Sequence, residues 1–237
     1  MVRDLIEATH PDWQDLLYKA LQSVDSHYLL ELEKSANWLP GLNSIFAAFS
    51  IPLSATNYIL LGESPYPRPQ SANGYAFWDN SVQQLWSDSG LSKEVNRATS
   101  FRNWLKMLLL ARGDLDNDFS QPAIASLDKS QYWQTGDEFF NSLLKKGFLL
   151  LNASLVFSEN KVQFHARHWR PFIHNLLSQL AEYKHLQLIL FGQIAKQVSE
   201  VNFFTCLIAE HPYNLSFITN PQVLAYFKPL DLLNRHA

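Results

Sequence analysis

The chain has 237 residues, of which 47% are hydrophobic and 17% charged, and its formal net charge is −3. This length and apolar content suffice for one large domain with a substantial core, whereas the slight negative charge argues against a protein that coats nucleic acid over its whole surface. The single cysteine excludes an internal disulfide and a cysteine metal cluster. No apolar run approaches the ~20 residues that span a bilayer, and the first residues lack the pattern of a signal peptide, so we expect a cytoplasmic protein.

The first part of the chain predicts two amphipathic helices, over residues 11–24 and 26–38, because leucines recur there at helical spacing. Ser26 is the expected N-cap of the second helix. We expect both helices, within residues 1–50, to pack on the rest of a single domain that covers residues 1–237.

A buried strand and a rigid loop follow. The apolar run predicts a strand over residues 56–62. Prolines at positions 65, 67 and 69 then oppose regular structure, because each fixes φ and lacks an N–H group. Gly74 closes the loop. Open α/β sheets place their sites at the carboxyl ends of strands, so the functional residues should converge on residues 63–77.

The remainder alternates helices with short apolar strands. Residues 80–96 and 112–130 are expected to form irregular surface segments, and residues 157–168 a polar loop. Helices are predicted over residues 100–110 (with Ser100 as N-cap), 136–146, 169–183, 192–201 and 221–234, and strands over 148–152, 186–191 and 204–209. This alternation predicts an α/β fold, a three-layer α/β/α arrangement with a central four-stranded parallel sheet.

Four strand-end segments carry a family resemblance. They are Gly-Glu-Ser-Pro-Tyr-Pro (62–67) with Asn-Gly-Tyr-Ala-Phe (73–77), Leu-Leu-Leu-Asn (149–152), Leu-Phe-Gly-Gln (190–193) and His-Pro-Tyr-Asn-Leu-Ser (211–216). In order, type and spacing they resemble the uracil-DNA glycosylase superfamily, in its classical bacterial and human branch. That family carries Gly-Gln-Asp-Pro-Tyr-His, Gly-Leu-Ala-Phe, Leu-Leu-Leu-Asn and His-Pro-Ser-Pro-Leu-Ser. The resemblance spans residues 56–234, with 112–130 poorly matched.

The resemblance implies a DNA glycosylase of base-excision repair, which hydrolyses the N-glycosidic bond of uracil or a related damaged base flipped out of DNA. Phe77 would then stack on the base, and Asn152 would hydrogen-bond its O4 and N3–H edge. Tyr66 would crowd C5 and exclude thymine. His211 would donate a hydrogen bond to O2 as negative charge builds on the leaving base.

The resemblance also implies contacts to DNA. Leu215 would act as the wedge that fills the gap left by the flipped nucleotide, and Ser100, Gly192, Gln193 and Ser216 would contact the phosphate backbone. A basic rim could include Arg97, Arg102, Lys106, Lys161, Arg167 and Arg170, although each alone is typical of a solvated charge. His165 and His168 lack partners for a metal site. We expect no metal or other cofactor, DNA as the partner, no membrane binding and a monomer.

The first motif departs from the family. Ser64 replaces the aspartate that positions the attacking water, Glu63 replaces a glutamine, and Pro67 replaces a histidine. Gly-Glu-x-Pro resembles the iron–sulfur uracil glycosylases of thermophiles, although their four cysteines are absent. In one interpretation Glu63, with Ser64 and His211, carries the chemistry.

Two alternatives remain open. In one, the protein is a catalytically weakened or inactive homologue that binds DNA or a base without cleavage. In the other, it is an unrelated α/β enzyme acting on a small molecule. The sequence favours the glycosylase.

Overall fold

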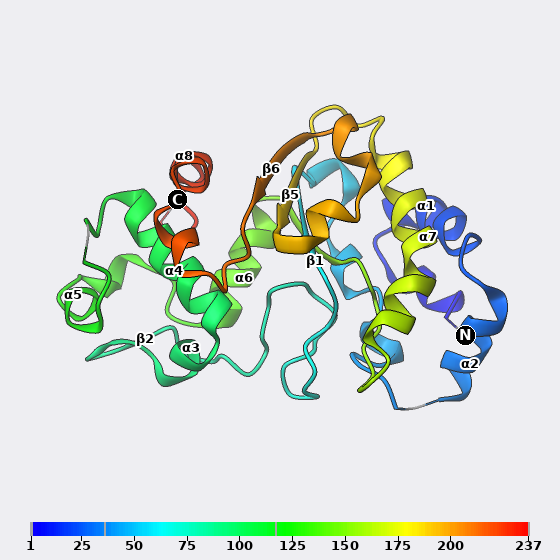
Figure 1. The fold of residues 1–237 in the computed structure, drawn as a ribbon, viewed down its shortest axis with the longest axis horizontal. Helices are drawn as coiled ribbons and strands as arrows, with labels where there is room; N and C mark the ends of the chain where they lie inside the picture. The colour runs from blue at the N-terminus through cyan, green and yellow to red at the C-terminus, as the bar shows by residue number, and fades with distance from the viewer. Residues whose placement is uncertain (1, 36, 117, 237) are drawn as a thin grey trace. The chain divides into compact units, whose positions relative to one another are not determined.

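The computed structural model describes residues 2–35, 37–116 and 118–236. Its central sheet has four parallel strands in the order β4-β1-β5-β6, flanked by helices (Figure 1). The strands are β1 (Tyr58–Gly62), β4 (Phe148–Asn152), β5 (Gln187–Phe191) and β6 (Thr205–Ala209). Tyr58 lies in register with Phe148 on one side and with Gln187 on the other. The predicted α/β fold and its four strands are confirmed.

The inner strands are buried on both faces, which explains their continuous apolar sequences. Ile59 and Leu61 of β1 pack into a core with helices, and the intervening Leu60 is equally inaccessible to solvent. A parallel sheet of this kind holds its strand ends rigidly, and these ends carry the predicted site residues.

The chain divides into two compact units. One comprises Met1–Trp78, Leu144–Leu190 and Ile194–Cys206, and the other comprises Asp79–Leu143, Phe191–Gln193 and Leu207–Ala237. A single domain over the whole chain stays a prediction.

The first unit is built on α1 (Pro11–Leu21), α2 (Ser26–Lys34) and α7 (Val162–Leu180). Gln179 of α7 donates a hydrogen bond to the Leu16 carbonyl of α1 at 3.1 Å, and the two helices lie side by side (Figure 1). Both predicted N-terminal helices are present, but Ser26 is not the cap. The Asp25 carboxylate accepts from the Tyr28 N–H at 2.8 Å instead.

The predicted loop over residues 157–168 is wrong in its second half, because α7 already begins at Val162. His165 is buried there, with its Nδ1 2.7 Å from the Tyr28 hydroxyl and its Nε2 3.0 Å from Ser158 Oγ. The polar residues that suggested a surface loop therefore include part of a packed helix face.

The second unit contains α3 (Lys93–Arg97), α4 (Thr99–Arg112), α5 (Gln121–Ala125), most of α6 (Gly136–Lys145), α8 (Pro221–Phe227) and a hairpin of β2 (Trp86–Ser87) with β3 (Gly90–Leu91). Its core surrounds Trp104, whose ring lies against those of Phe101, Phe139 and Phe227. Residues 80–96 and 112–130 are thus more ordered than predicted.

Several segments form 3₁₀ helices: Asp4–Ala8, Leu42–Ser44, Ala47–Ser50, Leu53–Ala55, Lys129–Gln131, Gly192–Lys196, Ser199–Phe203, Leu215–Thr219 and Lys228–Leu230. The helix predicted over residues 192–201 is therefore two short turns, and the last α-helix ends at Phe227 rather than near residue 234. Within the described residues, no helix combines the length and apolar character needed to cross a bilayer.

Candidate functional site

The ends of β1 and β4 bring Gly62 and Asn152 side by side in register. A Cβ atom placed on Gly62 would lie 2.7 Å from Asn152 Oδ1, 2.9 Å from Ala76 Cβ and 3.5 Å from Phe77 Cε2. The carboxamide of Asn152 and the ring of Phe77 therefore both close on the space that only a glycine leaves open. These two predicted base-binding residues are brought together.

Backbone hydrogen bonds continue beyond the strands and fix the loop. The N–H groups of Ala153 and Ser154 donate to the carbonyls of Gly62 and Glu63 at 2.8 and 2.9 Å, and the Ala76 N–H donates to Leu150 O at 3.0 Å. The main chain at Glu63 and next to Phe77 is thereby attached to the rigid sheet.

The turn before Phe77 depends on Gly74, whose φ is 92°, because a Cβ there would lie 2.0 Å from the Ser44 carbonyl oxygen. Phe77 itself has a φ of 63°, which is uncommon for a residue with a side chain and is found at functional sites. The Tyr66 hydroxyl donates to the Phe77 carbonyl at 3.2 Å. Tyr66 and Phe77 are thus held together in one strained loop.

The predicted site residues of the first unit differ in how far they are exposed to solvent. Asn152 is buried, with 2% of its surface exposed. Tyr66, Phe77 and Ser64 are half-buried, and Glu63 is exposed. A buried carboxamide that offers both a donor and an acceptor, next to an aromatic ring, can recognise the polar edge of a planar heterocycle.

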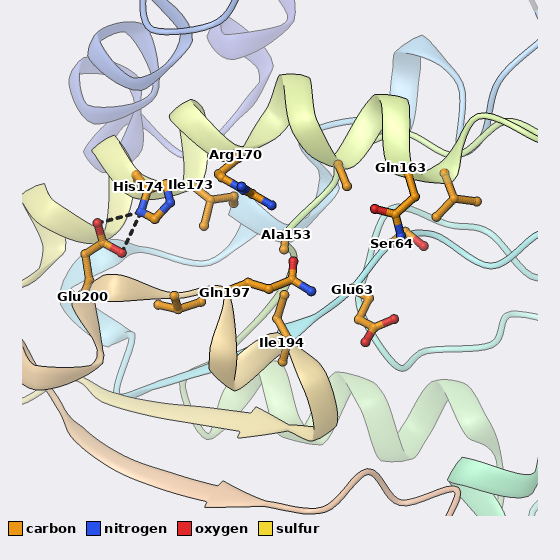
Figure 2. Close-up of a pocket in the computed structure, with 13 residues that line it drawn as sticks. Glu63, Ser64, Ala153, Gln163, Arg170, Ile173, His174, Ile194, Gln197 and Glu200 are labelled. Atoms are coloured by element: carbon orange, nitrogen blue, oxygen red, sulfur yellow. Dashed lines mark hydrogen bonds and ion pairs between the residues drawn. The ribbon is translucent and has the colours of Figure 1, made fainter.

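Glu63 and Ser64 also line a pocket of about 80 Å³ between α7 and the segment over residues 194–200. Glu63 and Ser64 lie at one end of this pocket, and a His174–Glu200 ion pair lies at the other (Figure 2). The complete lining is Glu63, Ser64, Ala153, Val162, Gln163, Ala166, Arg170, Ile173, His174, Ile194, Gln197, Val198 and Glu200. Arg170, predicted only as part of a basic rim, thus belongs to a defined cavity.

The second unit holds the other predicted group. Gly192 has a φ of 75°, and a Cβ there would lie 3.0 Å from His211 Cβ and 3.5 Å from His211 Cδ2. The Tyr213 backbone N–H donates to His211 Nδ1 at 3.1 Å. Because a backbone N–H can only donate, the neutral imidazole carries its proton on Nε2. His211 therefore presents Nε2–H as a hydrogen-bond donor.

The loop over residues 211–216 rests on α4. The buried Asn103 donates through Nδ2 to the carbonyls of Pro212 and Tyr213, at 2.8 and 3.3 Å. These hydrogen bonds attach the loop to α4. Two large side chains of the loop are nevertheless exposed, Tyr213 by 66% and Leu215 by 71%. The role of Leu215 as a wedge stays a prediction.

The predicted phosphate contacts stay predictions. Ser100 is not the N-cap of α4, because the helix begins at Thr99, Ala98 is the N-cap, and no side chain caps the helix there. Gln193 and Ser216 are exposed, and Gly192 is half-buried. Partial burial, with Arg102 nearby, lowers the pKa of Lys106.

The predicted residues thus form two local groups, one in each unit: Glu63, Ser64, Tyr66, Phe77 and Asn152 in the first, and Gly192, Gln193, His211, Leu215 and Ser216 in the second. Their joint action in one site stays a prediction. Among the described residues, no cluster of His, Cys, Asp and Glu side chains could hold a metal ion.

Comparison with known proteins decides the family. No family model matches the chain. A solved structure of UNG from Nitratifractor salsuginis is 40% identical, with a TM-score of 0.91, over 97% of this chain and 94% of that one. The chain belongs to the uracil-DNA glycosylase superfamily.

More distant relatives of the same family agree. A uracil-DNA glycosylase of Campylobacter lari is 30% identical over 176 residues, 73% of this chain and 64% of that protein, so the chain spans under two thirds of its length. One from Mycoplasma genitalium is 28% identical over 96% of this chain and 86% of its own. Mimivirus uracil-DNA glycosylase, at 18% identity and a TM-score of 0.57, shares the fold.

Several residues near the predicted site residues were missed by sequence reasoning. Asn103 lies in the middle of a helix, and nothing in its neighbourhood indicated a contact with residues more than 100 positions away. His174 and Glu200 are hydrogen-bonded to each other, and neither stretch of sequence contains a motif that predicts this contact. Only the helical repeat of Val162, Ala166 and Arg170 on α7 offered a signal that these residues share a face.

Proposed function

We propose that this member of the uracil-DNA glycosylase superfamily removes uracil, or a related damaged base, from DNA by hydrolysing the N-glycosidic bond. The observation that carries the proposal is the close approach of Asn152 and Phe77 to Gly62 at the ends of two paired strands. We further propose that the protein acts as a cytoplasmic monomer that binds DNA and flips the target base.

Recognition of the base would use the first group. The Asn152 carboxamide would donate to O4 and accept from N3–H of uracil, whereas cytosine presents the opposite pattern of donor and acceptor. Phe77 would stack on the ring, a contact typically worth about 1–3 kcal/mol. Tyr66, held to the Phe77 carbonyl, would block the methyl group of thymine.

Cleavage would transfer the electrons of the C1′–N1 bond to the base while water attacks C1′. Glu63 would orient this water, accept its proton and stabilise the positive charge on the sugar. His211 would donate its Nε2–H to O2 of the departing anion, an interaction strongest in the transition state. Ser64 has no charge and would supply only a hydrogen bond. Ser100, Gly192, Gln193 and Ser216 would contact phosphates, and Leu215 would fill the vacated stack.

The second candidate function is binding without cleavage. It is favoured by Ser64, because a positioned acid or base typically contributes about 10²–10⁴-fold to the rate and serine cannot replace aspartate in that role. Glu63 is also exposed, so a bound substrate would be needed to hold its carboxylate in the position that catalysis requires.

The two functions are separated by incubation with uracil-containing single- and double-stranded oligonucleotides, followed by alkaline cleavage of abasic sites. Strand breaks at uracil support the glycosylase, and their absence at high protein concentration and long times contradicts it.

The Ser64→Asp variant tests whether the remaining site is competent. If the glycosylase chemistry is only weakened, restoring a carboxylate beside Glu63 should raise the single-turnover rate by about 10-fold or more, within the range of a positioned base. Ser64→Asn is the control of similar size without charge. An aspartate variant no faster than the asparagine variant would contradict the expectation.

A further inference from the structure

The pocket beside Glu63 and Ser64 has a wall that the proposed chemistry does not use. Val162, Ala166, Arg170 and His174 recur every four residues along α7, so they form one face of the helix. Ile194 of the 3₁₀ helix Gly192–Lys196 and Val198, the N-cap of the next 3₁₀ helix, line the opposite side. The result is a slot between two walls rather than an open surface.

The lining of this slot combines apolar walls with hydrogen-bonding groups. Ile173, Ile194 and Val198 are buried or nearly so and supply flat apolar contact. Gln163 and Gln197 offer both donors and acceptors, and Arg170 and Gln197 extend into the space between the walls (Figure 2). A guanidinium plane can stack on an aromatic ring and hydrogen-bond its edge.

The far end of the slot is closed by the hydrogen-bonded pair of His174 and Glu200. His174 Nδ1 lies 2.8 and 2.9 Å from the two carboxylate oxygens of Glu200, and Ser199 Oγ lies 3.2 Å from Glu200 Oε2. The Glu200 side chain is only 8% exposed. Both oxygens of this buried carboxylate are therefore already engaged in hydrogen bonds with His174 and Ser199.

We propose that this pocket binds the base of the nucleotide adjacent to the flipped one in the same strand. The inference rests on the proposed function, since Glu63 and Ser64 belong both to the reacting site and to the mouth of this pocket. A neighbouring base is tethered within one backbone repeat of the reacting sugar. Its planar ring and polar edge suit apolar walls with two carboxamides and a guanidinium.

A base held in this slot is neither paired with a complementary base nor stacked on the neighbouring bases of its own strand. The pocket therefore selects substrates whose strand can unstack at two successive nucleotides. A single strand meets this condition readily, whereas a duplex must break a second base pair. The protein should accordingly favour single-stranded DNA and distinguish bases at one flanking position through Gln163 and Gln197.

The test uses single-stranded oligonucleotides that contain a 2′-fluorinated deoxyuridine, which resists hydrolysis, with 2-aminopurine placed on its 5′ or its 3′ side. Fluorescence of 2-aminopurine is quenched by stacking on other bases. We expect a several-fold rise for one of the two placements when the full-length protein binds, and no rise when 2-aminopurine lies several nucleotides away.

Variants locate the signal. Ala166→Phe fills the slot and should abolish the rise while binding, followed by anisotropy, persists. Arg170→Gln should reduce the rise and weaken binding about fivefold or more, as expected for loss of one stacked base. Arg167→Gln removes the same charge from the same helix outside the pocket, and should lower affinity slightly without changing the rise. Circular dichroism and melting verify that each variant folds.

The outcomes separate the two proposals. Binding with no rise at either flanking position, or with a rise that survives Ala166→Phe, overturns the pocket assignment and leaves the glycosylase proposal intact. A protein that shows the rise but releases no base from cleavable uracil DNA keeps the pocket and loses the glycosylase. Failure to bind the oligonucleotide contradicts both.

Discussion

At the scale of single residues, Gly62 determines how closely the predicted base-binding groups approach each other. Its neighbours Asn152 Oδ1 and Ala76 Cβ would lie within 3 Å of any added Cβ. Ala76 cannot retreat, because its N–H is hydrogen-bonded to Leu150, so the Asn152 carboxamide would have to rotate away from an added Cβ. Glycine at position 62 is therefore required for the close approach of Asn152 and Phe77 in the predicted base-binding site.

Gly62→Ala should cost about 1–3 kcal/mol of folding free energy, as expected for overpacking, and should reduce uracil release more than this loss of stability explains, because Asn152 is displaced. Melting temperature and single-turnover rate, measured on the same preparation well below the melting transition, test the prediction. A variant with unchanged rate would show that Asn152 is not held against Gly62 in the working site.

The residues of the first group could be predicted from their match to the motifs of the family that the chain resembles. Their mutual contacts could not. The hydrogen bond from Tyr66 to Phe77 depends on a left-handed φ at Phe77, and no propensity rule predicts that conformation for phenylalanine. The capping assignments of Ser26 and Ser100 were wrong by one or two positions, because several adjacent residues could begin each helix.

At the scale of elements, α4 supports the loop that carries His211. Asn103 donates to two loop carbonyls, and Arg102 approaches the Asn103 carboxamide oxygen at 3.4 Å. The His211 ring is oriented in turn by the Tyr213 N–H. We therefore expect Asn103 to act as a positioning residue, through the loop rather than on a substrate.

Asn103→Ala should lower the rate of uracil release by loosening His211, at a cost to stability of about 1–3 kcal/mol for the buried Pro212 carbonyl and the partly buried Tyr213 carbonyl left without this donor. The decisive measurement is a double-mutant cycle with His211→Ala. If Asn103 acts through His211, the double variant releases uracil no more slowly than His211→Ala alone. Additive losses would indicate an independent, purely structural role.

The helices were predicted well where an apolar stripe was continuous and poorly where polar residues were buried in pairs. The first turns of α7 were missed because the polar His165 is buried there, hydrogen-bonded to Tyr28 and to Ser158. A single sequence does not reveal such partners. The strands β1, β4 and β5 were predicted almost to the residue, since a strand buried on both faces has a continuous apolar sequence.

At the scale of the whole molecule, His165 makes stability depend on pH. Burial, followed by the nearby charge of Lys161, lowers the pKa of His165 from 6.5 to about 4. The unfolded chain therefore binds a proton at higher pH than the folded chain does. Stability from this group is fully present above about pH 6.5 and is lost as the pH falls toward 4.

We expect the free energy of unfolding, measured by urea titration, to fall by about 1–3 kcal/mol more in the wild type than in His165→Asn between pH 7 and pH 4. Carboxylates titrate in both proteins, so the difference between them isolates His165. Parallel pH profiles for the two proteins would show that His165 titrates normally in the folded state.

The proposed function depends on Glu63, whose carboxylate lies one residue before the position of the family's aspartate. It also depends on a base-binding site formed by Asn152 and Phe77. The most direct measurement is the single-turnover rate of uracil release from a single-stranded oligonucleotide by the wild type and by Glu63→Gln, which keeps the size of the side chain and removes its charge. The account predicts release by the wild type and a fall of about 10²–10⁴-fold in the variant. Equal rates in the two proteins, or no release by the wild type, would contradict it.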